Sequence, residues 1–230
     1  AAAATPAAVL VLQSRPVEAM LARPIPESGE RLPVIGLGTW QTFDPPRVDE
    51  QSLSALREVL QSFHARGGRV VDSSPMYGKS ESVLGRLSTE LGINGDLFIA
   101  TKVWTRGRDE GERQMRQSMT DLGREKLELM QAHNLVDWRT HLVTLRQWKD
   151  SGRFRHIGVT HYQASAFDEL ERILRTEQLD FVQLPYSIAM RAAEERLLPA
   201  ARDTGTAVLV NRPFEGGGLF SKGRDKPLPD

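Results

Sequence analysis

The sequence predicts an α/β protein with a parallel β-sheet, and three observations support this fold class. Short apolar runs with strand character alternate with longer segments whose apolar residues recur at helical spacing. Each connection between strands is long enough to hold a crossover helix, which parallel neighbours require. The runs read as strands are apolar almost throughout, as expected for a sheet covered by helices.

The beginning of the chain is expected to lie outside the fold. Residues Ala1–Ala19 are rich in alanine and include a short apolar run at residues 7–12. Such a stretch is compatible with a tag remnant, a structureless tail or the remnant of an export signal. We interpret residues 1–22 as a flexible or processed tail and residues 23–230 as a single domain. The cytoplasm is the default compartment, with the periplasm as the alternative if the tail is a signal remnant.

The first elements of the domain follow from a turn and a helical stripe. The turn residues Glu27-Ser28-Gly29 predict an N-terminal β-hairpin, and residues 34–38 (VIGLG) are read as the next strand. A helix is predicted over residues 48–66, and Gly67-Gly68 ends it. The apolar residues on one face of this helix are Leu53, Leu56, Val59, Leu60 and Phe63.

The same strand–helix unit then recurs along the chain. Further strands are predicted at residues 69–72, 97–101, 127–132, 156–159, 181–184 and 206–210. The helices between them are predicted at residues 79–91, 112–122, 140–151, 165–175 and 191–203. Gly152 is expected to end the third of these helices, and Ser165 with Asp168 to form a capping box for the fourth. Pro199 is expected to kink the last helix or end it early.

Two parallel architectures fit this pattern, an open doubly wound sheet and a closed barrel. The first usually carries a Gly-x-Gly-x-x-Gly turn, which Gly36 and Gly38 imitate without a third glycine at the right spacing. A barrel needs eight strand–helix units in ~250 residues. The segment after Val210 reads as a loop without a strand. The predicted fold class is therefore a parallel (β/α)8 TIM barrel truncated after the seventh strand, in a protein whose natural chain continues past Asp230.

Composition excludes several classes of function. The chain carries 30 basic and 30 acidic residues and no apolar stretch near the ~20 residues of a membrane span. Neither nucleic acid nor a membrane is therefore expected as a partner. The sequence has no cysteine, and no pair of histidines has metal-ligand spacing, so thiol chemistry is excluded and no metal is predicted. We expect a small-molecule partner and a monomer or weak oligomer.

Four residues with proton chemistry are expected at one edge of the sheet. Asp72 follows the run RVV, Lys102 follows FIAT, His133 follows LELMQA, and Tyr77 lies five residues beyond Asp72. Taken singly, each has an ordinary explanation, such as a solvated charge, a helix cap or a loop aromatic. Because the carboxyl ends of parallel strands meet at one edge, their joint occurrence indicates a site.

These four residues suit proton donation to a carbonyl oxygen. A nearby ammonium favours the phenolate, so Lys102 is expected to lower the pKa of Tyr77 from its reference value near ~10. Asp72 is expected to pair with Lys102, because a buried ammonium without a partner is costly. His133 is expected to orient the substrate oxygen by a hydrogen bond, whichever tautomer it adopts.

At these residues the chain resembles the aldo/keto reductase family. The resemblance lies in segments that occur in family order between about Leu32 and Phe220: LPVIGLGTW, VVDSSPMYGKSESVLG, IATKVW, QAHN, RHIGVTHY, DFVQLPYS and RPFEGGGLF. It implies NADPH or NADH as hydride donor and an aldehyde or ketone as substrate. It also implies Tyr77 as general acid, Asp72 and Lys102 as the pair that tunes it, and His133 as the orienting residue.

The resemblance implies further contacts with cofactor and substrate. The cofactor residues would be Gly38, Thr39, Trp40, Asp72, Thr160, His161, Gln183, Asn211, Arg212, Pro213, Phe214 and Gly216. Among these, Thr160 and Gln183 would bind the nicotinamide carboxamide, and residues 212–218 would lie along the pyrophosphate, where glycine amides point at phosphate oxygens. The substrate pocket would be lined by Trp40, Tyr77, Trp104 and His133, with Met76 beside them. In the alternative for Trp104, its side chain packs under a loop.

The sequence departs from the family pattern at three points. His161 replaces the usual asparagine, and Asn211 replaces an aromatic that often stacks on the nicotinamide. The adenosine-phosphate site would lie beyond Asp230, which leaves the choice between NADPH and NADH open. Two other functions remain in competition: a catalytically weak nicotinamide-binding regulatory or interaction protein on the same barrel, and a lyase that uses Lys102 as a Schiff base.

Overall fold

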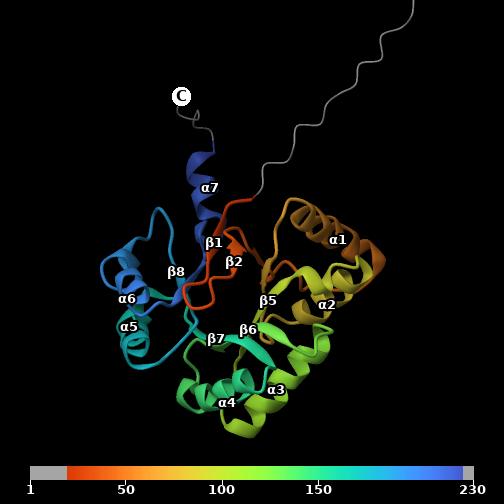
Figure 1. Ribbon diagram of the computed structural model, residues 1–230. Helices are drawn as coiled ribbons and strands as arrows, with labels where there is room; N and C mark the ends of the chain where they lie inside the picture. The colour runs from red at the N-terminus through yellow and green to blue at the C-terminus, as the bar shows by residue number, and fades with distance from the viewer. Residues whose placement is uncertain (1–19, 225–230) are drawn as a thin grey trace, which may run out of the picture.

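Seven parallel strands form one curled sheet in the computed structural model, which describes residues 20–224 (Figure 1). They follow one another in chain order, and each pairs in parallel with the next. The strands are β3 (Leu37–Gly38), β4 (Val70–Asp72), β5 (Phe98–Val103), β6 (Leu127–His133), β7 (Phe154–Thr160), β8 (Phe181–Pro185) and β9 (Ala207–Asn211). A doubly wound sheet reverses its strand order, whereas this unbroken order is that of a barrel wall. The predicted parallel fold is confirmed.

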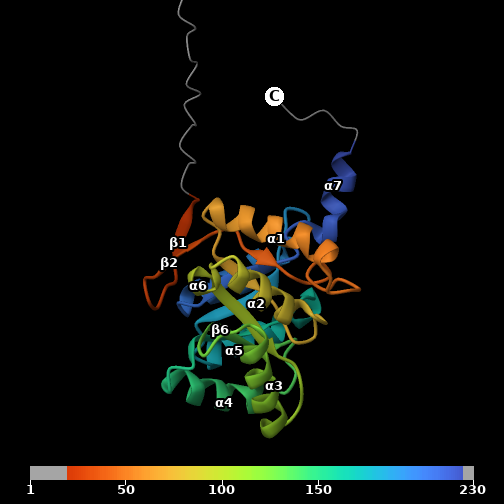
Figure 2. The ribbon, with the colours of Figure 1, turned by 90° about the vertical axis from the view of Figure 1, so that its right-hand side faces the viewer.

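The helices cover the outer face of the sheet. Figure 1 shows them arranged round the curled sheet in chain order, with α7 extending away from it, as it also does in the rotated view of Figure 2. They are α1 (Glu50–Ala65), α2 (Ser80–Glu90), α3 (Arg108–Asp121), α4 (Trp138–Asp150), α5 (Phe167–Thr176), α6 (Leu197–Asp203) and α7 (Gly218–Gly223). None of the helices within residues 20–224 is long and apolar enough to cross a membrane.

The larger apolar core lies between these helices and the sheet. Helix α1 illustrates why the sequence folds this way: Asp49 accepts a hydrogen bond from the main-chain N–H of Ser52 and caps the helix. Leu53 and Leu60 on its inner face are buried, and burial of each leucine stabilises the fold by roughly 1.5–3 kcal/mol. Val59, which was assigned to the same stripe, is exposed, because the buried face is narrower than the apolar pattern.

A smaller apolar core fills the inside of the curled sheet. It contains inward-facing residues of the wall, among them Val70, Phe98 and Phe181. The predicted N-terminal hairpin is present as β1 (Ala22–Pro24) paired antiparallel with β2 (Arg31–Pro33). Its residues Ile25 and Leu32 pack into the same core, so the hairpin closes the amino end of the strands. The first strand residue, Ala22, falls inside the range predicted as tail, whose residues 1–19 lie outside the described part.

Several predicted elements differ in the structure. Residues 34–36 are not in a strand, because pairing with β4 begins at Leu37. The expected capping box fails: a 3-10 turn (Ala164–Ala166) precedes α5, and no side chain caps that helix. The helix predicted over residues 191–203 is divided into a 3-10 turn (Ala192–Glu194) and α6, which puts Pro199 in a first helical turn, where proline is tolerated.

The segment after β9 also departs from the prediction. It was expected to be a loop, but it forms a 3-10 turn (Glu215–Gly217) followed by α7. Within residues 20–224 the sheet has seven strands, with β3 and β9 at its edges. The carboxyl ends of all seven strands form one rim, and the predicted site residues lie there.

Candidate active site

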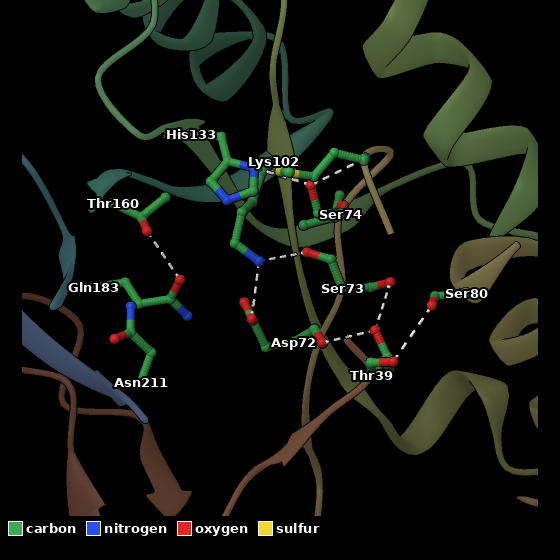
Figure 3. Close-up of polar contacts among 12 residues, drawn as sticks. Thr39, Asp72, Ser73, Ser74, Ser80, Lys102, His133, Thr160, Gln183 and Asn211 are labelled. Atoms are coloured by element: carbon green, nitrogen blue, oxygen red, sulfur yellow. Dashed lines mark hydrogen bonds and ion pairs between the residues drawn. The ribbon is translucent and has the colours of Figure 1, made fainter. Parts of the chain in front are cut away.

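The rim gathers the predicted residues from successive strands. Asp72 is the last residue of β4, His133 the last of β6 and Thr160 the last of β7. Lys102 is the penultimate residue of β5, one residue deeper than expected, since that strand continues to Val103. Figure 3 shows Lys102 at the centre of this group, with Asp72 on one side and His133 on the other.

A loop with a sharp bend carries Tyr77 from the end of β4 to the start of α2. Its bend depends on Gly78, which has a φ of +58°, a conformation that other residues rarely adopt. A Cβ added there would lie 2.3 Å from Asp44 Oδ2, so a larger residue would have to displace the Asp44 carboxylate. Asp44 holds the loop by accepting a hydrogen bond from the main-chain N–H of Lys79, at 3.0 Å.

Lys102 and Asp72 form the ion pair that the sequence suggested. Lys102 Nζ lies 2.8 Å from Asp72 Oδ2 and donates a second hydrogen bond to the carbonyl oxygen of Ser73, at 2.5 Å. The lysine side chain has no solvent exposure. Burial disfavours its ammonium, but the neighbouring Asp72 and Tyr77 outweigh this and raise the pKa of Lys102. A Schiff-base lyase needs the free amine, which this pairing disfavours.

Tyr77 lies with the face of its ring toward that ammonium. Lys102 Nζ is 4.8 Å from the centroid of the ring, a cation–π distance. Burial raises the pKa of Tyr77 above its ordinary value, although Lys102 acts in the opposite direction. The expectation of a lowered pKa was therefore wrong. Its physical reason is that desolvation of the phenolate outweighs the attraction of an ammonium that lies over the ring.

His133 is buried and contacts both Tyr77 and Ser74. Its ring meets the Tyr77 ring edge-on, with 5.8 Å between centroids. Its Nδ1 lies 3.0 Å from the hydroxyl oxygen of Ser74. Burial, together with the nearby Lys102 and His161, lowers the pKa of His133 to about 2. The imidazole is therefore neutral at physiological pH.

Thr160 and Gln183 form a second polar group on the neighbouring strands. The Thr160 hydroxyl donates to Gln183 Oε1 at 3.0 Å, and both side chains are buried. The amide nitrogen of Gln183 has no hydrogen-bond partner among the described residues and is free to donate. Asn211 Nδ2 donates to the main-chain carbonyl of His161 at 3.2 Å, while its buried Oδ1 has no partner among the described residues. The His161 ring stacks on Tyr162.

The other predicted cofactor residues fall into two groups. Thr39 is buried, and its hydroxyl lies 2.9 Å from Ser73 Oγ and 3.1 Å from the carbonyl oxygen of Asp72, so it supports the wall from within. Gly38 leaves open space above its Cα. Beyond β9, Phe214 is exposed and packs against Phe220. The residues of this loop are Arg212, Pro213, Phe214, Glu215 and Gly216, three of which have positive φ: Arg212, Glu215 and Gly216.

Three large apolar side chains are exposed at the same sector of the rim. Trp40 follows β3 and is 56% exposed, Trp104 follows β5 and is 42% exposed, and Met76 lies on the loop after β4. Trp104 is thus not packed under a loop. Its main-chain N–H donates to Gln114 of α3 at 2.5 Å, which fixes the backbone and leaves the indole free.

Sequence reasoning missed the residues that support the site. Ser73 supplies a carbonyl to Lys102, Ser74 contacts His133, and Asp44 and Gln114 hold the two rim loops. A pair of serines between two candidate residues was the one available signal. Serine is so frequent in loops that this signal carries little weight.

Fold and rim together define the class: an α/β-barrel protein with a candidate proton-transfer site at the carboxyl ends of its strands. Within that class the chain belongs to the aldo/keto reductase family, whose model matches residues 34–229.

Two curated relatives show how much of such proteins the chain represents. It is 26% identical over 208 residues to the aldo-keto reductase YhdN of Bacillus subtilis, a match that covers 81% of this chain and 60% of the relative. It is 27% identical over 217 residues to the NADH-specific methylglyoxal reductase of Escherichia coli, covering 80% and 64%. The chain thus spans less than two thirds of the length of these relatives.

Solved structures agree with the fold. An aldo/keto reductase from Klebsiella pneumoniae in complex with NADP and acetate superposes with a TM-score of 0.70 at 23% identity, covering 85% of this chain and 69% of that one. A glycerol dehydrogenase from Gluconobacter oxydans gives 0.73 at 22% identity, covering 91% and 68%. At these identities the likeness establishes the fold alone.

Proposed function

We propose that this protein reduces aldehydes or ketones to alcohols with NADPH or NADH, and that Tyr77 supplies the proton. The observation that carries this proposal is the ion pair of buried Lys102 with Asp72 beneath the Tyr77 ring, next to a neutral histidine. An ammonium held at full burial beside a phenol stabilises the phenolate that remains after proton donation.

The rim also offers groups suited to a nicotinamide. Gln183 presents free amide donors because Thr160 occupies its oxygen, and Asn211 Oδ1 is a buried acceptor without a partner in the described residues. A carboxamide has one acceptor and two donors, so it matches this pair. When bound, the reduced nicotinamide would supply the hydride. Relatives differ in nucleotide: the Klebsiella protein was solved with NADP, and the Escherichia coli reductase is named as NADH-specific.

The chain's own residues would divide the remaining work. Tyr77 would donate its proton to the substrate oxygen, and a raised pKa keeps that proton in place at neutral pH. His133 would hold the same oxygen by a hydrogen bond. Trp40, Met76 and Trp104 would cover the apolar part of the substrate from the rim, since each is exposed there.

One observation favours the regulatory alternative. Asn211 is hydrogen-bonded to the His161 carbonyl and offers no aromatic face to a nicotinamide. Weak cofactor retention would suit a nicotinamide-binding interaction protein with little turnover. The two functions differ in steady-state carbonyl reduction, which the first requires and the second lacks.

The test combines nucleotide binding with turnover. NADPH and NADH fluorescence titration is followed by reduction of a generic aldehyde, for the wild type and for Tyr77→Phe. Tyr186→Phe is the matched control, because its hydroxyl binds Glu194. We expect binding in all three proteins and loss of turnover in Tyr77→Phe alone. Binding without turnover in the wild type would transfer support to the regulatory function, and undiminished turnover in Tyr77→Phe would refute the proton donor.

A further inference from the structure

Ser74 is the hydrogen-bond partner of His133 within the described residues. Its hydroxyl oxygen lies 3.0 Å from Nδ1, at the start of the loop that carries Tyr77 (Figure 3). Ser74 has no solvent exposure and His133 has very little. The contact joins the end of β6 to the β4–α2 loop across 59 residues of sequence, so it depends on the folded rim.

The arrangement of donors sets the direction of this hydrogen bond. A serine hydroxyl has one proton and two lone pairs. The main-chain N–H of Met76 donates to Ser74 Oγ at 3.3 Å and occupies one lone pair. Of the described side chains and carbonyls, His133 Nδ1 is the acceptor within reach of the serine proton. If Nδ1 were protonated, the serine proton would be buried without an acceptor, which is unfavourable.

We infer that Ser74 is a positioning residue that fixes His133 in the tautomer with its proton on Nε2. The Ser74 hydroxyl donates to Nδ1, and the ring is neutral, so the remaining ring proton is on Nε2. Nε2 has no hydrogen-bond partner within residues 20–224. It is therefore a free donor inside the site.

The consequence of this inference rests on the proposed function, whereas the tautomer itself follows from the Ser74 hydrogen bond and the neutral ring of His133. A donor at Nε2 attracts a carbonyl oxygen, whereas the opposite tautomer would present a lone pair and repel it. Ser74 would thus make the site select the carbonyl form of the substrate. It acts through His133 and does not itself touch the substrate.

The tautomer is measured directly in the wild-type protein. In a two-dimensional proton–nitrogen NMR spectrum, the two ring nitrogens of a neutral histidine have well separated shifts according to which one is protonated. The signals of His133 are assigned by their loss in His133→Gln. We expect a protonated Nε2 and an unprotonated Nδ1 that stay constant from pH 6 to pH 9. A protonated Nδ1 in the wild type would overturn the inference without any variant.

Variants test the dependence on the hydroxyl. Ser74→Ala should give a mixed or reversed tautomer and about a tenfold lower kcat/KM for aldehyde reduction, the effect of one net hydrogen bond. Ser74→Thr should keep the wild-type spectrum. Ser88→Ala is the control, because Ser88 is equally buried but its hydroxyl bonds to the carbonyls of Leu84 and Gly85 and to Asn94, and not to a residue of the rim. An unchanged tautomer in Ser74→Ala would overturn the inference. A wild type with the expected tautomer but no turnover would instead remove the proposed function and leave the role of Ser74 intact.

Discussion

Lys102, a fully buried lysine, is paired with Asp72, which is only partly buried. Removal of one charge therefore leaves the remaining charge in a different environment from removal of the other. Asp72→Asn would leave an unpaired ammonium on a side chain with no solvent exposure. Lys102→Met would leave a carboxylate on a side chain that is 21% exposed, although its Oδ1 is buried and has no partner among the described residues.

We expect Asp72→Asn to cost about 3–5 kcal/mol in free energy of unfolding, the range for a buried charge deprived of its partner. Lys102→Met should cost clearly less, because methionine fills the space without a charge. Urea denaturation of both variants measures the difference. Equal losses would show that the ammonium is not the costly member of the pair.

Gly78→Ala should destabilise the protein by about 1–3 kcal/mol through backbone strain, and more through the clash with Asp44. Gly29→Ala is the matched control, since Gly29 also has a positive φ but open space around it. Gly29→Ala should lower the free energy of unfolding by the contribution of backbone strain alone. Thermal unfolding of both variants separates the two contributions, and the combined change Asp44→Ala with Gly78→Ala should recover part of the loss.

Glu81 predicts a pH dependence of stability. Burial raises the pKa of its carboxyl from 4.5 to about 7, although Thr101 and Ser118 donate hydrogen bonds to it. Between these two values the folded protein binds more protons than the unfolded chain, so stability is highest below about pH 4.5 as far as this group is concerned. It then falls by about 3 kcal/mol as the pH rises through 7.

Glu81→Gln should remove this pH dependence and reduce the slope of unfolding free energy between pH 5 and 7.5. Urea denaturation across that range measures the slope. Glu112→Gln on α3 serves as the control with an unchanged slope in this window, because the hydrogen bond from Arg108, and further that from Arg116, lower the pKa of Glu112 below its ordinary value of 4.5. If the free energy of unfolding fell more steeply with rising pH in Glu81→Gln than in the wild type, the ionised carboxylate of Glu81 would be the form that stabilises the fold.

The raised pKa of Tyr77 predicts an asymmetry between the two reaction directions. Reduction needs the phenol, which persists at and above neutral pH, so its rate should be level from pH 6 to 9. Oxidation of an alcohol needs the phenolate and should rise about tenfold per pH unit over the same range. Steady-state rates in both directions give the two profiles. An oxidation rate that levels off near neutral pH would indicate a lowered pKa.

Thr160→Val should weaken nicotinamide binding about tenfold, because the Gln183 amide loses the hydrogen bond that fixes its orientation. Thr206→Val removes a buried threonine hydroxyl at the opposite end of the strands, where it donates to the Leu179 carbonyl. It should leave nucleotide affinity unchanged. Fluorescence titration compares the two, and equal losses would mean that the first effect is a general loosening.

The strands were predictable because a covered parallel strand must be apolar along its whole length. This signal located six of the seven sheet strands to within a few residues, together with the hairpin, whose turn residues were explicit. The run at residues 34–38 was too long because apolar character does not reveal where pairing begins. The breaks near Arg196 and Ala166 depend on how helices meet neighbouring loops, which periodicity does not record.

The site was predictable in its charges and less so in their surroundings. Position at a strand end was enough to bring Asp72 and Lys102 together. The direction of the Tyr77 pKa depends on how much water reaches the phenol, and the contact of Ser74 with His133 depends on the path of a loop. A local pattern of residues indicates neither the access of water to the Tyr77 phenol nor the path of the loop that carries Ser74.

The hairpin beneath the sheet has no chemistry of its own, yet Ile25 and Leu32 keep water from the inner ends of the strands. An interior without water strengthens the attraction between Lys102 and Asp72, because attraction between charges weakens wherever water can reorient around them. Ala100, two residues before Lys102 on β5, belongs to the same core as these two aliphatic side chains at the far end of the barrel wall. A mutational survey confined to the rim would overlook them.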